Sequence, residues 1–291
     1  MPASRFVPAL NLGTMLGLPS WSAAPTGEAA KIAAALQQAG YRGVQGTDDP
    51  AYARAGLVTY GSGRVVAPDE AYELLVKQQQ AGHLCSTLHV GTGFENDGEA
   101  LRLIEAILAA SSRLGHPAHI ETHRATITQD IWRTMGWIER VPEMTFNADL
   151  SHWYTGLEMP YGDFAAKLAF MQPFFDRVRF VHGRIGSGGA IQIAVGVGGH
   201  DEPHASRFSQ MWQHCFAGFL ASAPSGETIV FAPELLPESV ETPDGPLFID
   251  YALTTKAPDG AFSEGSDRWE QALRLTEMAK SAFAAASSQP A

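Results

Sequence analysis

Four side chains able to bind a metal ion lie near the ends of four successive apolar segments of the chain. They are Glu121 in HIETH, Asp149 in NADLSH, His182 in FVHGR and Glu234 in FAPEL. Each segment is apolar enough to be a buried strand, where a carboxylate without a partner is costly. Three carboxylates and one imidazole that converge repel one another unless a cation lies among them. The set therefore predicts a divalent metal site that suits Mn²⁺, Mg²⁺, Co²⁺ or Zn²⁺.

Each of these residues also has an ordinary structural interpretation. An acidic residue after a strand commonly caps a helix or forms a salt bridge. A histidine on a strand is commonly a hydrogen-bonded core residue. The recurrence of such groups on four consecutive segments favours the joint metal site over four unrelated structural roles.

Four further polar residues accompany the predicted ligands and are expected to contact a substrate. They are His89, His123, His152 and Arg184. Arg184 follows His182 by two, so both side chains share one face of a regular strand, where a guanidinium binds a hydroxyl, carbonyl or phosphate. His152 follows Asp149 by three, a spacing that brings both to one mouth only if the chain turns at Asp149.

A repeated order of strand and helix positions these residues. Strands are expected at 6–11, 43–47, 57–66, 84–90, 119–123, 144–153, 179–185 and 228–235. Helices are expected at 28–39, 50–54, 69–81, 99–114, 131–140, 164–176, 204–221 and 267–285. Pro173 lies inside one of these helices and is expected to kink or split it.

Eight strand–helix units predict a parallel sheet with right-handed crossovers. The fold class is therefore α/β, a (β/α)8 TIM barrel as a single domain over residues 1–291, with the barrel at about 5–285. Because the second and third strands are weak, an open doubly wound sheet is the alternative. In a closed barrel the carboxyl ends of all strands meet at one mouth, where catalytic groups come from several strands.

A long connection at about 183–203 contains the Gly-rich stretch 186–199. It is interpreted as a mobile loop over an active site, an inserted hairpin, or a loose surface loop without a role. His200 or His204, at its end, is expected to close over the substrate.

Composition excludes several other classes of protein. The chain has 291 residues, of which 45% are hydrophobic and 18% charged, so extensive disorder is ruled out. The net charge of −11 argues against binding to nucleic acid. No apolar run approaches the roughly 18 residues that span a membrane. The two cysteines, 130 positions apart, suggest a cytoplasmic protein without disulfides. P-loop, Rossmann, GxSxG and HExxH motifs are not found.

The order of these motifs resembles the xylose isomerase-like TIM-barrel superfamily, and within it the sugar phosphate isomerase/epimerase proteins. The shared pattern is Glu on strand five, DxxH on strand six, HxR on strand seven and Glu on strand eight, over roughly residues 6–236. The resemblance implies one divalent metal, commonly Mn²⁺, held by the four predicted ligands. It also implies that His152 and Arg184 touch substrate, and that Glu121 and Glu234 flank the reacting carbons and exchange a proton.

The sequence departs from the DNA-repair branch of that superfamily, which uses extra histidines for a three-metal cluster. An Asp-x-His pair is expected there, whereas Asp201 and His204 are separated by one residue more. The superfamily also contains dehydratases, and the motifs do not separate these from isomerases.

The expected function is therefore a metal-dependent isomerase or epimerase of a small sugar or keto-polyol, with proton transfer through a metal-bound enediolate. Elimination from a keto-sugar by the same first step is the alternative within enzymes. A barrel that binds a carbohydrate without turnover is the alternative outside them. No cluster of basic residues clearly marks a phosphate site, which favours an unphosphorylated substrate. A symmetric homo-oligomer is expected only from its general frequency among soluble enzymes.

Overall fold

Eight parallel strands close into a barrel in which each strand pairs with the next and β1 pairs with β8. The computed structural model describes residues 5–196, 202–256 and 262–288. The barrel strands are β1 Phe6–Asn11, β2 Gly43–Gln45, β3 Val58–Val65, β4 Ser86–Val90, β5 Ala118–Glu121, β6 Phe146–Ala148, β7 Val178–Gly183 and β8 Ile229–Pro233. The predicted TIM barrel is confirmed, and the open sheet is excluded.

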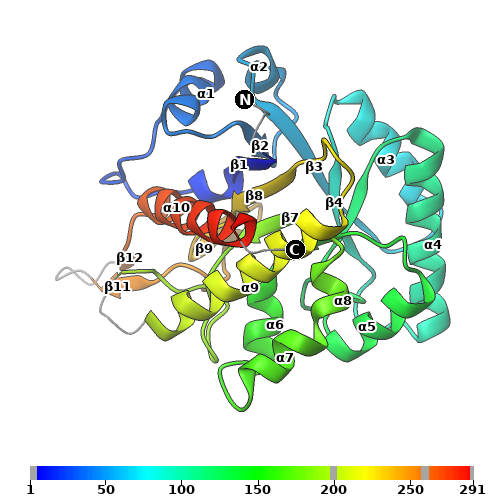
Figure 1. Ribbon diagram of the computed structural model, residues 1–291. Coiled ribbons are helices and arrows are strands. Elements are labelled where there is room, and N and C mark those ends of the chain that lie inside the picture. The colour runs from blue at the N-terminus through cyan, green and yellow to red at the C-terminus, as the bar shows by residue number, and fades with distance from the viewer. Residues whose placement is uncertain (1–4, 197–201, 257–261, 289–291) are drawn as a thin grey trace.

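Helices surround the strands (Figure 1). They are the 3₁₀ helix η1 Leu12–Met15, α1 Ala29–Gln38, α2 Pro50–Arg54, α3 Glu70–Gln80, α4 Asp97–Leu114, α5 Ile131–Arg140, α6 Leu150–Gly156, α7 Phe164–Phe170, α8 Gln172–Phe175, α9 Glu202–Ser222 and α10 Arg268–Ser287.

Helix α4 shows how the sequence forms these elements. Asn96 and Glu99 form a capping box at its start, and Gly115 ends it with φ of 62°. Leu103, Ile104 and Ile107 are buried with helical spacing. The helix therefore presents one apolar stripe to the barrel and a polar face to solvent.

An aromatic layer fills the interior of the barrel below its carboxyl end. The rings of Tyr60 and Phe180 meet edge to face with their centroids 5.4 Å apart, and both side chains are buried. Phe180 in turn packs edge-on against His182, with the ring centroids 5.6 Å apart. Since side chains alternate along a strand, Phe180 and His182 share the inner face of β7, and the aromatic layer forms the floor of the mouth.

The sixth strand is shorter than the sequence predicts. It ends at Ala148, and the second half of the predicted segment 144–153 forms α6, which Asp149 caps by accepting from the Ser151 backbone N–H. The side-chain cap and helix formation outweigh the strand preference of the aromatic residues that follow. Pro173 does divide the predicted helix at 164–176, into α7 and α8.

An insertion between β8 and α10 is not predicted from the sequence. It consists of two antiparallel pairs, one of β9 Ser239–Thr242 with β10 Gly245–Phe248 and one of β11 Thr254–Lys256 with β12 Phe262–Glu264. The insertion follows the strand that leads to Glu234, so it begins at the carboxyl end of the barrel.

The described part of the Gly-rich stretch, residues 186–196, forms no strand and is attached to the barrel. The Val195 backbone exchanges two hydrogen bonds with the Gln271 side chain, of 2.7 and 3.0 Å. A loose surface loop and an inserted hairpin therefore do not fit this part. His200 and Asp201 lie outside the described residues.

Among the described residues, no helix combines the length and apolar character that crossing a membrane requires.

Candidate metal centre

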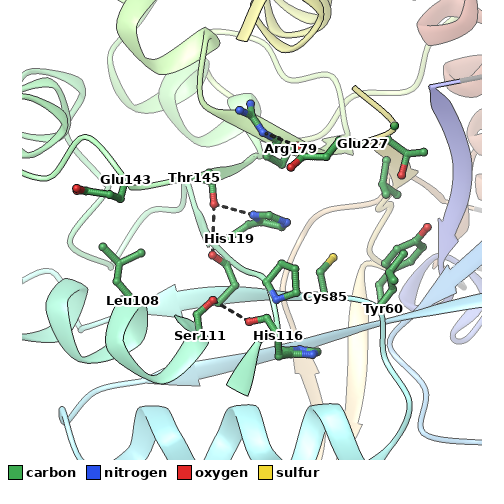
Figure 2. Close-up of a pocket in the computed structure, with 17 residues that line it drawn as sticks. Tyr60, Cys85, Leu108, Ser111, His116, His119, Glu143, Thr145, Arg179 and Glu227 are labelled. Carbon is green, nitrogen blue, oxygen red and sulfur yellow. Dashed lines mark hydrogen bonds and ion pairs between the residues drawn. The ribbon is translucent and has the colours of Figure 1, made fainter. Parts of the chain in front are cut away.

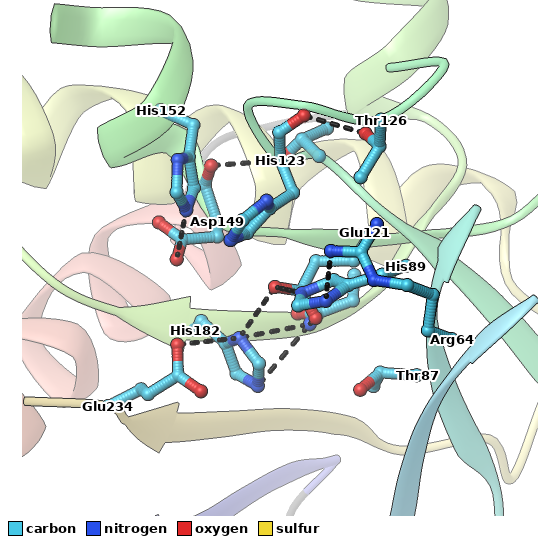
Figure 3. Close-up of polar contacts among 12 residues, drawn as sticks. Arg64, Thr87, His89, Glu121, His123, Thr126, Asp149, His152, His182 and Glu234 are labelled. Atoms are coloured by element: carbon cyan, nitrogen blue, oxygen red, sulfur yellow. Dashed lines mark hydrogen bonds and ion pairs between the residues drawn. The ribbon is translucent and has the colours of Figure 1, made fainter. Parts of the chain in front are cut away.

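The four predicted ligands meet at the carboxyl end of the barrel (Figure 3). Glu121 is the last residue of β5, His182 lies on β7, and Asp149 and Glu234 directly follow β6 and β8. One ligand atom from each of the four lies within 4.8 Å of the others. Glu121, Asp149 and His182 are buried, and the side chain of Glu234 is 17% exposed. The cluster thus opens to solvent on the side of Glu234.

The imidazole of His182 is oriented by a residue from the opposite half of the chain. Its Nε2 donates to Gln45 Oε1 at 2.7 Å, which leaves Nδ1 directed toward the carboxylates. Nδ1 lies 3.5 Å from Glu121 Oε1 and 3.4 Å from Glu234 Oε2. An imidazole whose second nitrogen donates to a fixed acceptor is the usual arrangement of a metal-binding histidine.

Arg184 joins two of the carboxylates. Its Nη2 donates to Asp149 Oδ2 in a short contact and to Glu234 Oε2 at 3.0 Å. Its Nε donates to Ser151 Oγ at 3.2 Å, whereas its buried Nη1 has no hydrogen-bond partner among the described residues. Arg184 is predicted from the sequence to hold a substrate group, and Nη1 is the donor that remains for this purpose.

Amide side chains complete the inner surface of the mouth, and the sequence analysis missed them. Asn11 Nδ2 donates to Glu234 Oε1 at 2.8 Å, and Asn147 Nδ2 donates to Glu121 Oε2 at 2.9 Å. The signal that could have found them is an amide on the inward face at a strand end, as at Asn11 and Gln45.

The three predicted histidines stand in a row beside the cluster. The ring centroids of His89 and His123 are 4.1 Å apart, and those of His123 and His152 are 3.8 Å apart. His89 Nε2 lies 2.9 Å from Glu121 Oε1, and His152 Nε2 lies 3.4 Å from Asp149 Oδ2. The turn at Asp149 expected for the DLSH motif is present, because helical i, i+3 spacing places His152 beside that carboxylate.

The side chain of His204 contacts helix α6. It lies in the first turn of α9, where its Nδ1 forms a 2.8 Å hydrogen bond with the hydroxyl group of Tyr154. Tyr154 and its neighbour Trp153 are fully buried core residues.

The charges of the cluster set its protonation. Burial acts to raise the pKa values of Glu121 and Asp149, but the positive charges of His182 and Arg184, respectively, outweigh it and hold both pKa values well below their ordinary range. Burial acts to lower the pKa of His182, but the charges of Glu234 and Glu121 raise it to about 9. Burial lowers the pKa of His123 to about 3 and also lowers that of His152.

This donor set fits a divalent cation. Three carboxylates face two compensating positive charges, Arg184 and the protonated His182, so the cluster keeps an excess negative charge. His182 Nδ1 would be free to bind a metal ion after losing its proton, and metal binding in proteins commonly releases protons in this way. Buried polar atoms without partners, His152 Nδ1 and Asn147 Oδ1, mark further unused capacity at the same place.

The second group of possible ligands, His89, Glu121 and His123, fits a cation less well. Arg64 Nη2 lies 3.3 Å from His89 Nδ1 and can only donate to it. The neutral ring then carries its proton on Nε2 and donates it to Glu121. This tautomer leaves His89 without a lone pair for a metal ion.

A cavity of about 650 Å³ lies at the opposite, amino end of the barrel (Figure 2). Its polar residues have partners: His119 Nδ1 bonds to Thr145 Oγ1 at 2.8 Å, and Arg179 Nε lies 3.4 Å from Glu227 Oε2. Its walls include Tyr60 and Cys85 and are mainly apolar. These paired groups and mainly apolar walls make this cavity a weaker candidate for the functional site than the carboxyl end.

Comparison with known proteins rests on structure alone, because no family model and no curated protein sequence matches the chain. A D-tagatose 3-epimerase-like protein matches with a TM-score of 0.56 and 9% identity, over 97% of this chain and 98% of that chain. The probable 3-DHS dehydratase AsbF of Bacillus anthracis, involved in petrobactin synthesis, matches with a TM-score of 0.52 and 13% identity, over 78% and 92%. These matches show that the chain shares its TIM-barrel fold with an epimerase-like protein and a probable dehydratase.

Proposed function

We propose that the protein is a divalent-metal enzyme that isomerises or epimerises a small polyhydroxy carbonyl compound. The observation that carries this proposal is the convergence of Glu121, Asp149, His182 and Glu234 at the mouth, with their ligand atoms within 4.8 Å. These four residues would hold the metal, with Mn²⁺ as the expected ion. When bound, the metal would polarise the carbonyl of the substrate as a Lewis acid.

The two glutamates are the proposed catalytic residues. Both oxygens of Glu234 accept hydrogen bonds, from Asn11 and Arg184, and Glu121 is held by Asn147 and His89. Such fixed carboxylates are suited to exchange a proton with a carbon next to a carbonyl group. Return of the proton to the neighbouring carbon gives an isomer, and return to the opposite face of the same carbon gives an epimer.

His152 is the second candidate for proton return. Its Nε2 faces Asp149, whereas its buried Nδ1 has no partner among the described residues. Because its pKa is lowered, the ring is neutral at pH 7, so Nδ1 can accept a hydrogen bond from a substrate hydroxyl or take up the proton that it would then return. Nη1 of Arg184 is proposed to donate to a substrate oxygen, and His89 and His123 to contact the substrate beside it.

Elimination is the second candidate reaction, since a probable dehydratase shares the fold. Removal of the same proton followed by loss of a β-hydroxyl group would form an unsaturated carbonyl compound. Recovered substrate that carries solvent deuterium, or its isomer, supports the first reaction; ultraviolet absorption of a new conjugated carbonyl supports the second. Bound metal without exchange from any tested keto-sugar would support a binding protein instead.

The primary test is metal analysis of the wild-type protein beside Asp149→Ala. Asp163→Ala is the matched control, because Asp163 also caps a helix, α7, but lies outside the cluster. We expect about one equivalent of metal in the wild type and in Asp163→Ala, and loss of the metal in Asp149→Ala. Wild-type protein that takes up no metal from excess Mn²⁺ would overturn the proposal.

A further inference from the structure

The insertion between β8 and α10 brings an aromatic residue onto the mouth of the barrel. Tyr251 lies between the β9–β10 and β11–β12 pairs and is 8% exposed. Its ring lies 5.0 Å from Cζ of Arg184, the arginine that joins Asp149 and Glu234. The insertion therefore contributes directly to the surface above the proposed metal centre.

A first chain of contacts leads from Arg184 through Tyr251 to Arg124. The phenol oxygen of Tyr251 accepts a hydrogen bond of 2.9 Å from Nη2 of Arg124, whose Cζ lies 5.4 Å from the same ring. The phenol thus lies between two guanidinium groups. One of them is buried at the cluster and the other is exposed.

A second chain of contacts starts at Glu121 and passes through His89. His89 Nδ1 lies 3.3 Å from Nη2 of Arg64, and Figure 3 shows the Arg64 side chain beside this imidazole. Arg64 Nη1 donates to the backbone carbonyl of Gly91 at 2.8 Å and to that of Ala125 at 3.4 Å. Since Ala125 follows Arg124, the two exposed arginines adjoin the same β5–α5 loop.

That loop is held firmly. Thr126 Oγ1 donates to the His123 carbonyl at 2.6 Å, and Thr128 Oγ1 donates to the Glu121 carbonyl at 2.6 Å. Ala125 adopts φ of 52°, a conformation that residues other than glycine rarely adopt without such support. The position of Arg124 is therefore fixed relative to the catalytic strand β5.

Neither Arg64 nor Arg124 has an acidic partner among the described residues. Among the described residues, no carboxylate lies within ion-pair distance of Arg64 or Arg124, in a chain with 31 acidic and 20 basic residues. Within the described part of the chain, ion pairs of arginine are formed only by Arg133, Arg179, Arg184 and Arg268, so the location of Arg64 and Arg124 beside the mouth is what distinguishes them. The guanidinium groups of Arg64 and Arg124 also keep N–H groups that donate to no described residue. Two cations that lack acidic partners beside a substrate site favour an anionic ligand.

We propose that Arg64, Arg124 and Tyr251, here called the rim, bind an anionic group of the substrate. The substrate would then be a carboxylated or phosphorylated polyhydroxy carbonyl compound, with its carbonyl group at the metal centre and its anionic group at the rim. This inference rests on the proposed function for the position of the carbonyl group. A carboxylated substrate agrees with the expectation of an unphosphorylated substrate from the sequence, and a phosphorylated one departs from it.

Binding of three probes to the Mn²⁺-loaded full chain tests the rim by calorimetry. D-Fructose is neutral, 2-keto-D-gluconate carries a carboxylate, and D-fructose 6-phosphate carries a phosphate. We expect at least one anionic probe to bind about tenfold or more tightly than D-fructose, with an affinity that falls as salt increases. The two anionic probes distinguish carboxylate from phosphate recognition.

Variants connect that preference to the rim. The double variant Arg64→Gln/Arg124→Gln should bring the affinity ratio between anionic and neutral probes close to one. Tyr251→Phe keeps the ring over Arg184 but removes the acceptor of Arg124, and should lower the ratio by about threefold. Arg54→Gln, an exposed arginine in the last turn of α2, is the control and should leave the ratio unchanged. Circular dichroism confirms that each variant is folded.

Equal affinities of the wild type for anionic and neutral probes would overturn the proposal. The absence of binding by all three probes would overturn it too. An unchanged ratio in the double variant would overturn it as well. These binding measurements need no turnover. If the rim confers an anion preference but no substrate exchanges deuterium, anion binding by the rim is supported and the proposed reaction is rejected. If a neutral ketose exchanges deuterium but no anion preference is found, the proposed reaction is supported and anion binding by the rim is rejected.

Discussion

The two ends of the barrel differ in whether their buried polar groups have hydrogen-bond or ion-pair partners. At the amino end, a cavity of about 650 Å³ is lined by His116, His119 and Arg179, which all have hydrogen-bond or ion-pair partners. At the carboxyl end, buried nitrogen atoms of Arg184 and His152 have none among the described residues. A buried polar atom without a partner carries a free-energy cost that a ligand removes. Unused bonding capacity beside a cluster of charged groups therefore distinguishes the carboxyl end as the candidate site.

The electrostatic character of the two ends differs in the same way. Burial raises the pKa of Cys85 at the amino end to about 12 and lowers that of His119 to about 3, so both groups are neutral at pH 7. At the carboxyl end, carboxylates with depressed pKa values face His182, whose pKa is raised to about 9. The carboxylates and His182 are therefore charged at the carboxyl end, whereas Cys85 and His119 are neutral at the amino end.

The largest expected effect is on turnover. Glu121→Gln and Glu234→Gln should each reduce it by about 10²- to 10⁴-fold, since an amide cannot exchange the proton. His119→Gln, at the amino end, should leave turnover within about twofold of the wild type because that residue is remote from the reacting carbons. Rates of solvent-deuterium uptake measure all three. Near-normal rates in both glutamine variants would show that the carboxyl end is not catalytic.

The next largest effect is on the stability of the metal-free protein. Arg184→Met leaves Asp149 and Glu234 without their shared cation, and breaking such a buried pair costs about 3–5 kcal/mol in the free energy of unfolding. Arg179→Met is the matched change at the amino end, where Glu227 is 46% exposed, and should cost about 1 kcal/mol or less through that ion pair. Urea unfolding measures both. Equal losses would contradict the distinction between the ends.

Saturating Mn²⁺ should recover part of the stability lost in Arg184→Met. The metal binds the folded state and replaces the missing positive charge between the carboxylates. A variant that Mn²⁺ does not stabilise would separate the role of Arg184 from that of the proposed metal.

The smallest effect is a pH dependence from the amino end. Because burial and the charges of Arg179 and His116 lower the pKa of His119 to about 3, the unfolded chain binds a proton more readily than the folded one. The stabilising contribution is complete above about pH 6.5 and is lost as the pH falls toward about 3. Between pH 6 and 5, the stability difference between wild type and His119→Gln should fall by about 1 kcal/mol. A constant difference would show that His119 is not neutral in the fold.

The sequence predicts most of the barrel because its elements are specified locally. Strand β1 and helices α2 and α5 have the predicted bounds, and Pro173 divides its helix as expected. The segment after Asp149 is misjudged because LSHWYTG is rich in aromatic residues, and only the side-chain cap shows that a helix begins there. The insertion with β9 to β12 is missed because its short, largely exposed strands carry no regular apolar alternation.

The candidate ligands are predictable because each is a polar residue at the end of an apolar strand. Their partners are not, since these depend on packing across the barrel. Arg184 reaches Asp149 from the neighbouring strand, where the β6–β7 register shifts between Phe146 and Asn147. Gln45 reaches His182 from a strand 137 positions away in the sequence. Tyr251 reaches Arg184 from the insertion that the sequence does not reveal.

The aromatic layer of Tyr60 and Phe180 has a consequence for how ligands approach. It separates the cluster from the cavity below with a layer of low dielectric constant, so the electric field of the buried carboxylates leaves the protein mainly through the mouth. A dissolved divalent cation is then attracted from one direction only, past Glu234. Its association rate should decrease as ionic strength rises, even where its final affinity changes little.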